Sequence, residues 1–202
     1  MQTADILAAL PQTQCTRCGY PDCAAYAKAI AHDDAPINQC PPGGAEGVVR
    51  LARLTGKPPL PLNPANGLAS PRTLVFIDEA WCIGCTLCIK ACPTDAIVGS
   101  NKRMHTVIEA HCTGCELCLP VCPVDCIGLE KVHPGDNPPT GWAAWPQALA
   151  DRARDRYAAR LVRLNLERPP QPSTRAPDAV LAAKKPSVIE AALAKARANR
   201  PT

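Results

Sequence analysis

Residues 82–93 read CIGCTLCIKACP, and residues 112–123 read CTGCELCLPVCP. A shift of 30 positions lays the second stretch over the first, cysteine on cysteine, and each stretch follows a run rich in β-branched residues, LVFID or HTVIE. Self-similarity of this kind predicts two copies of one small unit. We expect each copy to contain a strand, a cysteine-bearing loop, a short helix and a second strand, so that the two form a pseudo-twofold α+β module of about 55 residues.

Both copies have the cysteine spacing C-x2-C-x2-C-x3-C-P, which is typical of bacterial ferredoxins that hold two [4Fe–4S] clusters. In that arrangement three closely spaced cysteines bind one cluster and the fourth binds the other. Zinc sites differ, because they usually pair two CxxC units across a gap. The spacing therefore predicts two clusters, one bound by Cys82, Cys85, Cys88 and Cys122 and the other by Cys112, Cys115, Cys118 and Cys92.

Three further residues of the repeat need an interpretation. Gly84 and Gly114 lie between the first two cysteines of each copy. Glycine there serves either a close approach of the backbone to an inorganic sulfide or a turn with positive φ, and both can hold at once. Cys126 coincides with Ala96 in the other copy, and alanine cannot be a ligand. We therefore expect Cys126 to be a small buried thiol in the core.

The composition supports metal chemistry over a disulfide framework. The 202 residues include 13 cysteines, an odd number, but only 3% aromatic residues. The first residues, MQTADILAAL, lack the features of a secretory signal, and no stretch reaches the roughly 18 apolar residues of a membrane span. We therefore expect a cytoplasmic protein, whose thiols are kept reduced and available to metals.

A separate block of cysteines precedes the repeat with the spacing C-x2-C-x4-C-x16-C. Four thiolates suit either zinc or a [4Fe–4S] cluster, and the spacing alone leaves both open. The two cluster motifs that follow favour a third [4Fe–4S] cluster. Its ligands would be Cys15, Cys18, Cys23 and Cys40.

Composition shifts divide the chain into four segments. Helical patterns over residues 3–10, 23–32 and 46–54 predict a small, mostly helical domain. The four segments are a cluster domain (1–56), a Pro-rich linker (57–71), a two-cluster ferredoxin-like domain (72–131) and an Ala/Arg-rich tail (132–202). In the tail, residues 148–167 have helical periodicity, and residues 186–200 form a last helix or are disordered. The fold class predicted is α+β with a helical or partly disordered basic tail.

The rest of the sequence contains no visible site for bond-making chemistry. No dinucleotide-binding, phosphate-loop, zinc-protease or nucleophile-elbow motif occurs, so we expect no small-molecule substrate and no catalytic residue. Residues 127–202 hold 13 Lys and Arg against 7 Asp and Glu. A polyanion- or membrane-surface-binding role is the alternative that this basic tail leaves open, and nucleic acid is the less favoured partner.

Residues 4–130 resemble RnfB, the iron–sulfur subunit of the bacterial Rnf (Rsx) ion-translocating electron-transport complex. The resemblance lies in DILAALPQTQCTRCGYPDCAAYAKAIA, INQCPPGG, FIDEAWCIGCTLCIKACPTDAIVGSNKRMHTVI and CTGCELCLPVCPVDCI. It implies a [4Fe–4S] cluster on the first block, hence three clusters, and electron transfer with the other subunits of a redox-driven ion translocase at the inner membrane.

The family usually begins with a hydrophobic anchor helix, and here the first cysteine block stands almost at the start. We therefore expect a form without the anchor, cytoplasmic or peripheral on the cytoplasmic face of the inner membrane. The alternative function is a stand-alone soluble polyferredoxin that serves other redox partner proteins.

Overall fold

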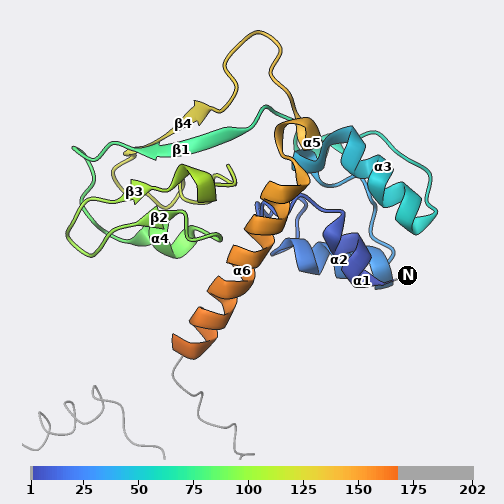
Figure 1. The fold of residues 1–202 in the computed structure, drawn as a ribbon, viewed down its shortest axis with the longest axis horizontal. Helices are drawn as coiled ribbons and strands as arrows, with labels where there is room; N and C mark the ends of the chain where they lie inside the picture. Colours follow the sequence, from blue (N-terminus) through green and yellow to red (C-terminus); the bar gives the residue numbers. More distant parts are fainter. Residues whose placement is uncertain (1, 168–202) are drawn as a thin grey trace, which may run out of the picture. The chain divides into compact units, whose positions relative to one another are not determined.

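The computed structural model describes residues 2–167 (Figure 1). The segment 168–202, which includes the predicted last helix at 186–200, lies outside the described residues. The described chain is a mixture of helices and short strands, and its order is α1, α2, α3, β1, α4, β2, β3, β4, α5 and α6, with three short 3₁₀ turns between them. None of the helices within residues 2–167 is long and apolar enough to cross a membrane.

The N-terminal part is built from α1 (Thr3–Ala8), α2 (Cys23–His32) and α3 (Gly44–Thr55). The three helices confirm the predicted periodicities with small changes at their ends. Asp22 begins α2 as its N-cap, because its carboxylate accepts a hydrogen bond of 2.7 Å from the backbone of Ala25. At the other end of the unit, Gly56 closes α3 in the left-handed conformation that glycine adopts without strain.

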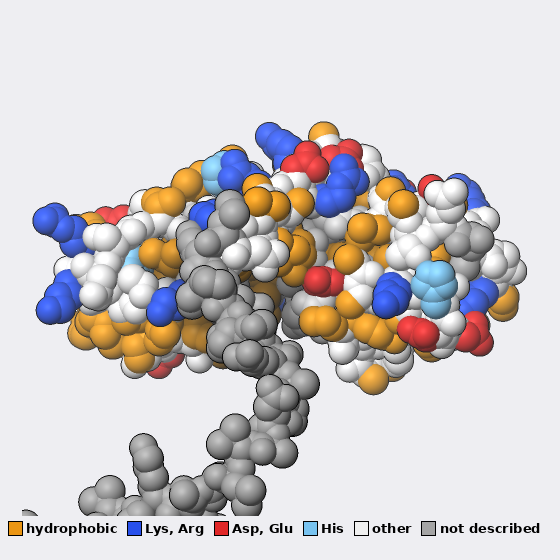
Figure 2. All heavy atoms as spheres, turned by 90° about the horizontal axis from the view of Figure 1, so that it is seen from below, with side chains coloured by type: hydrophobic (Ala, Val, Ile, Leu, Met, Phe, Trp, Pro, Cys, Tyr) orange, Lys and Arg blue, Asp and Glu red, His pale blue; other side chains and the backbone are white. Residues whose placement is uncertain are grey.

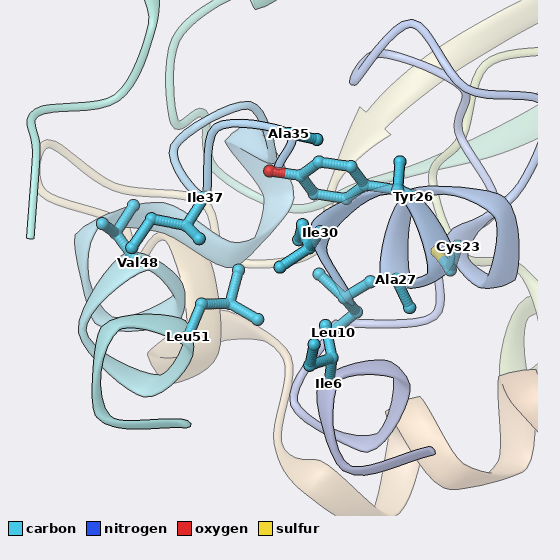
Figure 3. Close-up of a cluster of buried hydrophobic side chains, with 11 residues drawn as sticks. Ile6, Leu10, Cys23, Tyr26, Ala27, Ile30, Ala35, Ile37, Val48 and Leu51 are labelled. Carbon is cyan, nitrogen blue, oxygen red and sulfur yellow. The ribbon is translucent and has the colours of Figure 1, made fainter. Parts of the chain in front are cut away.

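These helices share one apolar core, in which side chains from α1, α2 and α3 point toward one another (Figure 3). The Tyr26 hydroxyl is anchored at its edge, donating to the carbonyl oxygen of Pro36 at 2.7 Å and accepting from the backbone N–H of Gln39 at 3.2 Å. The largest members of the core are almost completely buried: Ile6, Leu10, Tyr26, Ile30, Ile37 and Leu51.

The segment 57–71 leaves α3 and returns along this helical part. A 3₁₀ turn, η2 (Pro64–Asn66), interrupts it. The backbone N–H of Asn63 donates to the Asn38 carbonyl oxygen at 2.9 Å, and the Asn66 side chain donates to the Arg17 carbonyl oxygen at 2.9 Å. These contacts hold the Pro-rich segment against the N-terminal helices. Another 3₁₀ turn, η1 (Pro41–Gly43), precedes α3.

Strand pairing joins the two copies of the repeat. β1 (Thr73–Ile77) from the first copy pairs antiparallel with β4 (Ile127–Lys131) from the second. In the same way β2 (Ile97–Val98) pairs antiparallel with β3 (Thr106–Val107). Because each two-stranded sheet takes one strand from each copy, the copies can only fold together. Their shared core contains Val75, Ile97, Ile127 and most of the repeat's cysteines.

The predicted short helix occurs in the first copy only. α4 (Leu87–Ala91) contains a hydrogen bond from the backbone N–H of Lys90 to the Thr86 carbonyl oxygen at 3.1 Å. The second copy has Pro120 at the position of Lys90, and proline has no N–H to donate. The expectation of a helix in the second copy was therefore wrong: the chain there forms turns, after a 3₁₀ turn η3 (Glu109–His111).

After the repeat, α5 (Gly141–Ala144) and α6 (Gln147–Glu167) connect both halves of the described chain. The indole N–H of Trp145 donates to the Pro11 carbonyl oxygen at 2.7 Å. Farther along, the Tyr157 hydroxyl donates to Asp22 at 3.0 Å, and Arg160 and Arg163 reach Asp95 of the repeat at 2.6 and 2.8 Å. The contacts of α6 therefore span from the N-cap of α2 to the loop after Cys92.

Asp95 is the main electrostatic anchor of α6. Burial raises its pKa, but hydrogen bonds from Arg163 and Arg160 outweigh burial, so that the pKa of Asp95 lies below its usual range. Arg160 is only 8% exposed. The pair is therefore partly desolvated, and removing the carboxylate would leave a buried guanidinium without its counter-charge.

We expect Asp95→Asn to loosen α6 by about 2 kcal/mol, since a hydrogen bond to a charged group contributes roughly this much and its loss leaves Arg160 without its counter-charge. Anaerobic hydrogen exchange followed by mass spectrometry should then show α6 amides exchanging up to roughly 30-fold faster. The matched control is Asp155→Asn, which removes a carboxylate that is 74% exposed and whose ion pair within residues 2–167 is with Arg154 on the same helix. Unchanged exchange in the Asp95 variant would contradict this role.

Candidate metal centres

Each predicted set of four cysteines lines one cavity. The N-terminal cavity is lined by Cys15, Cys18, Cys23 and Cys40. The first repeat cavity is lined by Cys82, Cys85, Cys88 and Cys122. The second repeat cavity is lined by Cys112, Cys115, Cys118 and Cys92. In both repeat cavities the fourth cysteine comes from the opposite copy.

The loops that carry these cysteines repeat their backbone conformation. Unusual positive φ angles recur at an interval of 30 residues, at Thr86 (65°) and Glu116 (64°) and again at Asp95 (50°) and Asp125 (49°). Non-glycine residues rarely adopt such angles. Their recurrence at matching positions indicates that both loops wrap their cavities in the same way.

Gly84 and Gly114 follow the same rule, with φ of 69° and 67°. A Cβ on Gly84 would lie 2.4 Å from the backbone nitrogen of Arg103, and one on Gly114 would lie 2.4 Å from the carbonyl oxygen of Thr73. Both glycines are therefore required by positive φ together with a neighbouring backbone segment. The close approach that the structure describes is therefore between each glycine and a neighbouring segment of protein backbone.

Cys126 lines the first repeat cavity as a fifth cysteine. It is buried, as expected, and its Sγ lies 3.5 Å from the Sγ of Cys122. Burial opposes the Cys122 thiolate, but backbone N–H groups including those of Val124 and Cys126 together hold the pKa of Cys122 below its usual value. Cys122 is thus the member of this pair that is suited to be the thiolate, with Cys126 as its S–H donor.

Several of the other thiols have raised pKa values. Burial is the main cause that raises the pKa of Cys23 to about 12, with smaller contributions from neighbouring Cys15 and Cys18 and against an opposing backbone hydrogen bond. The pKa of Cys118 is raised to about 12 and that of Cys115 to about 11, again chiefly by burial. Thiols of this kind become thiolates when bound iron supplies the positive charge.

The donor sets fit a cluster. Each set of four thiols lines a pocket. Sulfur-only donors are the ligands that [4Fe–4S] clusters take. The four-thiol cavities therefore agree in donor chemistry with [4Fe–4S] clusters.

The N-terminal cavity is positioned by the loop before α2. Gln14 is 3% exposed, and its side-chain oxygen accepts a hydrogen bond of 3.0 Å from the backbone N–H of Cys23. Neighbouring Gln12 and Thr13 are also buried. This polar loop fixes the start of α2, where Cys23 is the first helical residue.

The repeat meets the N-terminal part beside two cavities. Thr13 lines the N-terminal cavity and Thr113 the second repeat cavity, and the Thr113 hydroxyl donates to the Thr13 carbonyl oxygen at 3.0 Å. An ion pair of 2.9 Å between Arg17 and Glu116 lies nearby. Sequence reasoning missed this junction, because nothing in the local pattern links residues 100 positions apart.

His105 was also missed as part of the site. It has no spacing typical of a metal ligand, and the structure places it on the wall of the first repeat cavity, 1% exposed. His105 stands 30 residues after Val75, so a comparison of the two copies shows a histidine where the other copy has a valine.

Comparisons with known families agree with both cysteine regions. Residues 75–129 match the family described as a 4Fe-4S dicluster domain. Residues 10–42 match a second family, described as an Fe-S cluster domain. The two matches cover all twelve cysteines that line the three cavities in the predicted sets.

Curated relatives are similar to half of the chain or more. A protein of Azoarcus sp. (strain BH72), named as the B component of an ion-translocating oxidoreductase complex, is 62% identical over 125 residues, or 62% of this chain and 68% of the relative. The protein of the same name from Alkalilimnicola ehrlichii is 54% identical over 153 residues, or 75% of this chain and 80% of the relative. That from Thiobacillus denitrificans is 62% identical over 101 residues, and the alignment spans only 54% of its length.

Proposed function

Since the chain belongs to the RnfB family of ion-translocating oxidoreductase complexes, we propose that it transfers electrons as the iron–sulfur subunit of an Rnf-type complex. The observation that carries the proposal is the set of three cavities, each lined by four cysteines of the predicted sets. When bound, a [4Fe–4S] cluster supplies a one-electron carrier. Three carriers in one chain suit a relay.

In this proposal twelve cysteines are ligands and Cys126 is not. Residues 1–56 hold one cluster, 57–71 link the parts, 72–131 form a pseudo-twofold ferredoxin-like domain with two clusters, and 132–202 form the tail. The recurrence of backbone angles and the strand pairing between copies support the twofold arrangement. The ligands are Cys15, Cys18, Cys23 and Cys40 in the N-terminal cavity, Cys82, Cys85, Cys88 and Cys122 in the first repeat cavity, and Cys112, Cys115, Cys118 and Cys92 in the second.

The contacts between the cavities give the relay an order. The N-terminal cavity adjoins the second repeat cavity through Thr13 and Thr113. Cys15 and Glu116 also line one common pocket between the two parts, of about 490 Å³. Electron transfer slows steeply with distance, so electrons pass between the N-terminal and second repeat cavities, and then to the first repeat cavity.

The partners are the other subunits of the complex, and the chain works on the cytoplasmic face of the inner membrane as a peripheral component. Figure 2 shows hydrophobic side chains exposed on the half of the molecule that carries the strands. Among the exposed apolar residues of the repeat are Ile83, between Cys82 and Cys85, and Trp81, which are 57% and 70% exposed. An apolar face beside the first repeat cavity suits contact with a subunit that exchanges electrons there.

Co-purification from native membranes tests this assignment. The tagged full-length chain should be recovered together with integral membrane subunits, and Ile83→Glu should lower that recovery by placing a charge on the apolar face. Leu68→Glu is the matched control, because Leu68 is 74% exposed but lies in the linker segment 57–71. Recovery wholly in the soluble fraction at every salt concentration would instead favour a free polyferredoxin.

A further inference from the structure

The two repeat cavities differ in their side chains although their backbones match. Val75 lines the second repeat cavity, and His105, thirty residues later, lines the first. In the same way Ala96 lines the second cavity and Cys126 the first. At these two matched positions the first repeat cavity has a side chain that can donate a hydrogen bond, and the second has an apolar one. The reverse holds for Thr94 and Thr113 of the second cavity, which match Val124 and Ile83 of the first. These two hydroxyls donate to the carbonyl oxygens of His111 and Thr13.

Both donors of the first repeat cavity reach predicted ligands. The Nδ1 atom of His105 lies 3.3 Å from the Sγ of Cys88, and the Sγ of Cys126 lies 3.5 Å from that of Cys122. A ligand thiolate carries no proton and can only accept, so the ring of His105 donates from Nδ1 and Cys126 donates its S–H. The Nε2 atom of His105 is buried and has no hydrogen-bond partner among the described residues, so the ring's one polar contact there is with the thiol.

The surroundings hold the imidazole in this position. His105 is 1% exposed, and its backbone N–H donates to the Sγ of Cys82 at 3.4 Å. Gly99 leaves the space that the ring occupies, since a Cβ there would lie 2.4 Å from the Cδ2 of His105. In the second copy the residue that matches Gly99 is Leu129, so this glycine is specific to the first copy. The donor is therefore built into the fold.

We propose that His105, assisted by Cys126, makes the cluster of the first repeat cavity easier to reduce than that of the second. An added electron increases the negative charge on the cluster and its thiolates, so hydrogen bonds to sulfur stabilise the reduced form and raise the reduction potential. The inference rests on the proposed function. In the relay order given above, the cluster that is easier to reduce is then the one at the end that bears the exposed apolar face.

The test is anaerobic voltammetry of the full-length protein loaded with its clusters. His105→Leu replaces the donor with an apolar side chain of similar branching. Cys126→Ala introduces the alanine that the other copy has at the matching position. Each should move one reduction wave, the more positive of the two from the repeat, to more negative potential and leave the other waves in place. His105→Asn, whose side-chain amide can donate from a similar position, should restore part of the shift.

Ile127→Val is the matched control, because Ile127 is a buried apolar residue of the same cavity wall and carries no donor. It should move no wave. Unchanged waves in both His105→Leu and Cys126→Ala, or a shift to more positive potential, would overturn the proposal while leaving the relay intact. A wild-type protein without redox-active clusters, established by iron analysis of the same samples, would instead overturn the proposed function and this inference with it.

Discussion

About 12 iron and 12 sulfide atoms per chain are expected in the anaerobically purified protein, and about eight of each after Cys15→Ala and Cys18→Ala are combined. The double substitution takes two of the four thiols from the N-terminal cavity. The remaining thiols, Cys23 and Cys40, are too few to hold a cubane. Iron, zinc and acid-labile sulfide should be measured on the same samples.

This measurement decides the question that the spacing of the first block leaves open. A wild-type protein with about eight iron atoms and one zinc would show that the N-terminal cavity is a zinc site. Cys126→Ala is the matched control, since it removes a buried cysteine from a cavity wall without removing a proposed ligand. It should keep all the iron, and a loss of about four iron atoms would assign Cys126 a ligand role.

Trp145→Ala should destabilise the protein by about 3–5 kcal/mol. The Trp145 side chain is 6% exposed, donates to the Pro11 carbonyl oxygen and lies under the guanidinium of Arg72, 4.5 Å from the ring centroid. Its loss opens a cavity between the N-terminal part and the segment after the repeat. It also leaves the buried Pro11 carbonyl without its donor.

The expected result is a lower temperature of cluster loss, followed anaerobically by visible absorbance at one heating rate. A chain of this size shifts by about 2–4 °C per kcal/mol, so the midpoint should fall by roughly 10 °C. Trp81→Ala removes the same side chain from a site where it is 70% exposed, and should shift the midpoint by very little. Equal effects of the two substitutions would contradict the role given to Trp145.

The cysteine sets could be predicted from the sequence because ligand spacing is a local property. Three thiols within about seven residues must face one point, and the repeat indicated where the fourth is exchanged. The structure brings each of these sets to one cavity. The N-cap at Asp22 is similarly local, because its carboxylate accepts from the backbone of Ala25, three residues later.

What the sequence did not predict depends on contacts between distant segments. The partnership of Asp95 with Arg160 joins residues 65 positions apart, and neither residue looks unusual in its own neighbourhood. Pro120 could be read from the sequence, but the repeat predicted a helix there. The chain forms turns instead, because proline has no backbone N–H to donate. His105 had no metal spacing, and only its burial against Cys88 makes it part of the site.

The position of α6 at the end of the described chain has a consequence for biogenesis. A ribosome releases the chain from its N-terminus, so all twelve proposed ligands leave the exit tunnel before the residues that clasp Asp22 and Asp95. Until then the two cysteine-bearing parts lack the helix that braces them. Cofactor insertion thus has an interval in which all twelve cysteines are released and α6 is not.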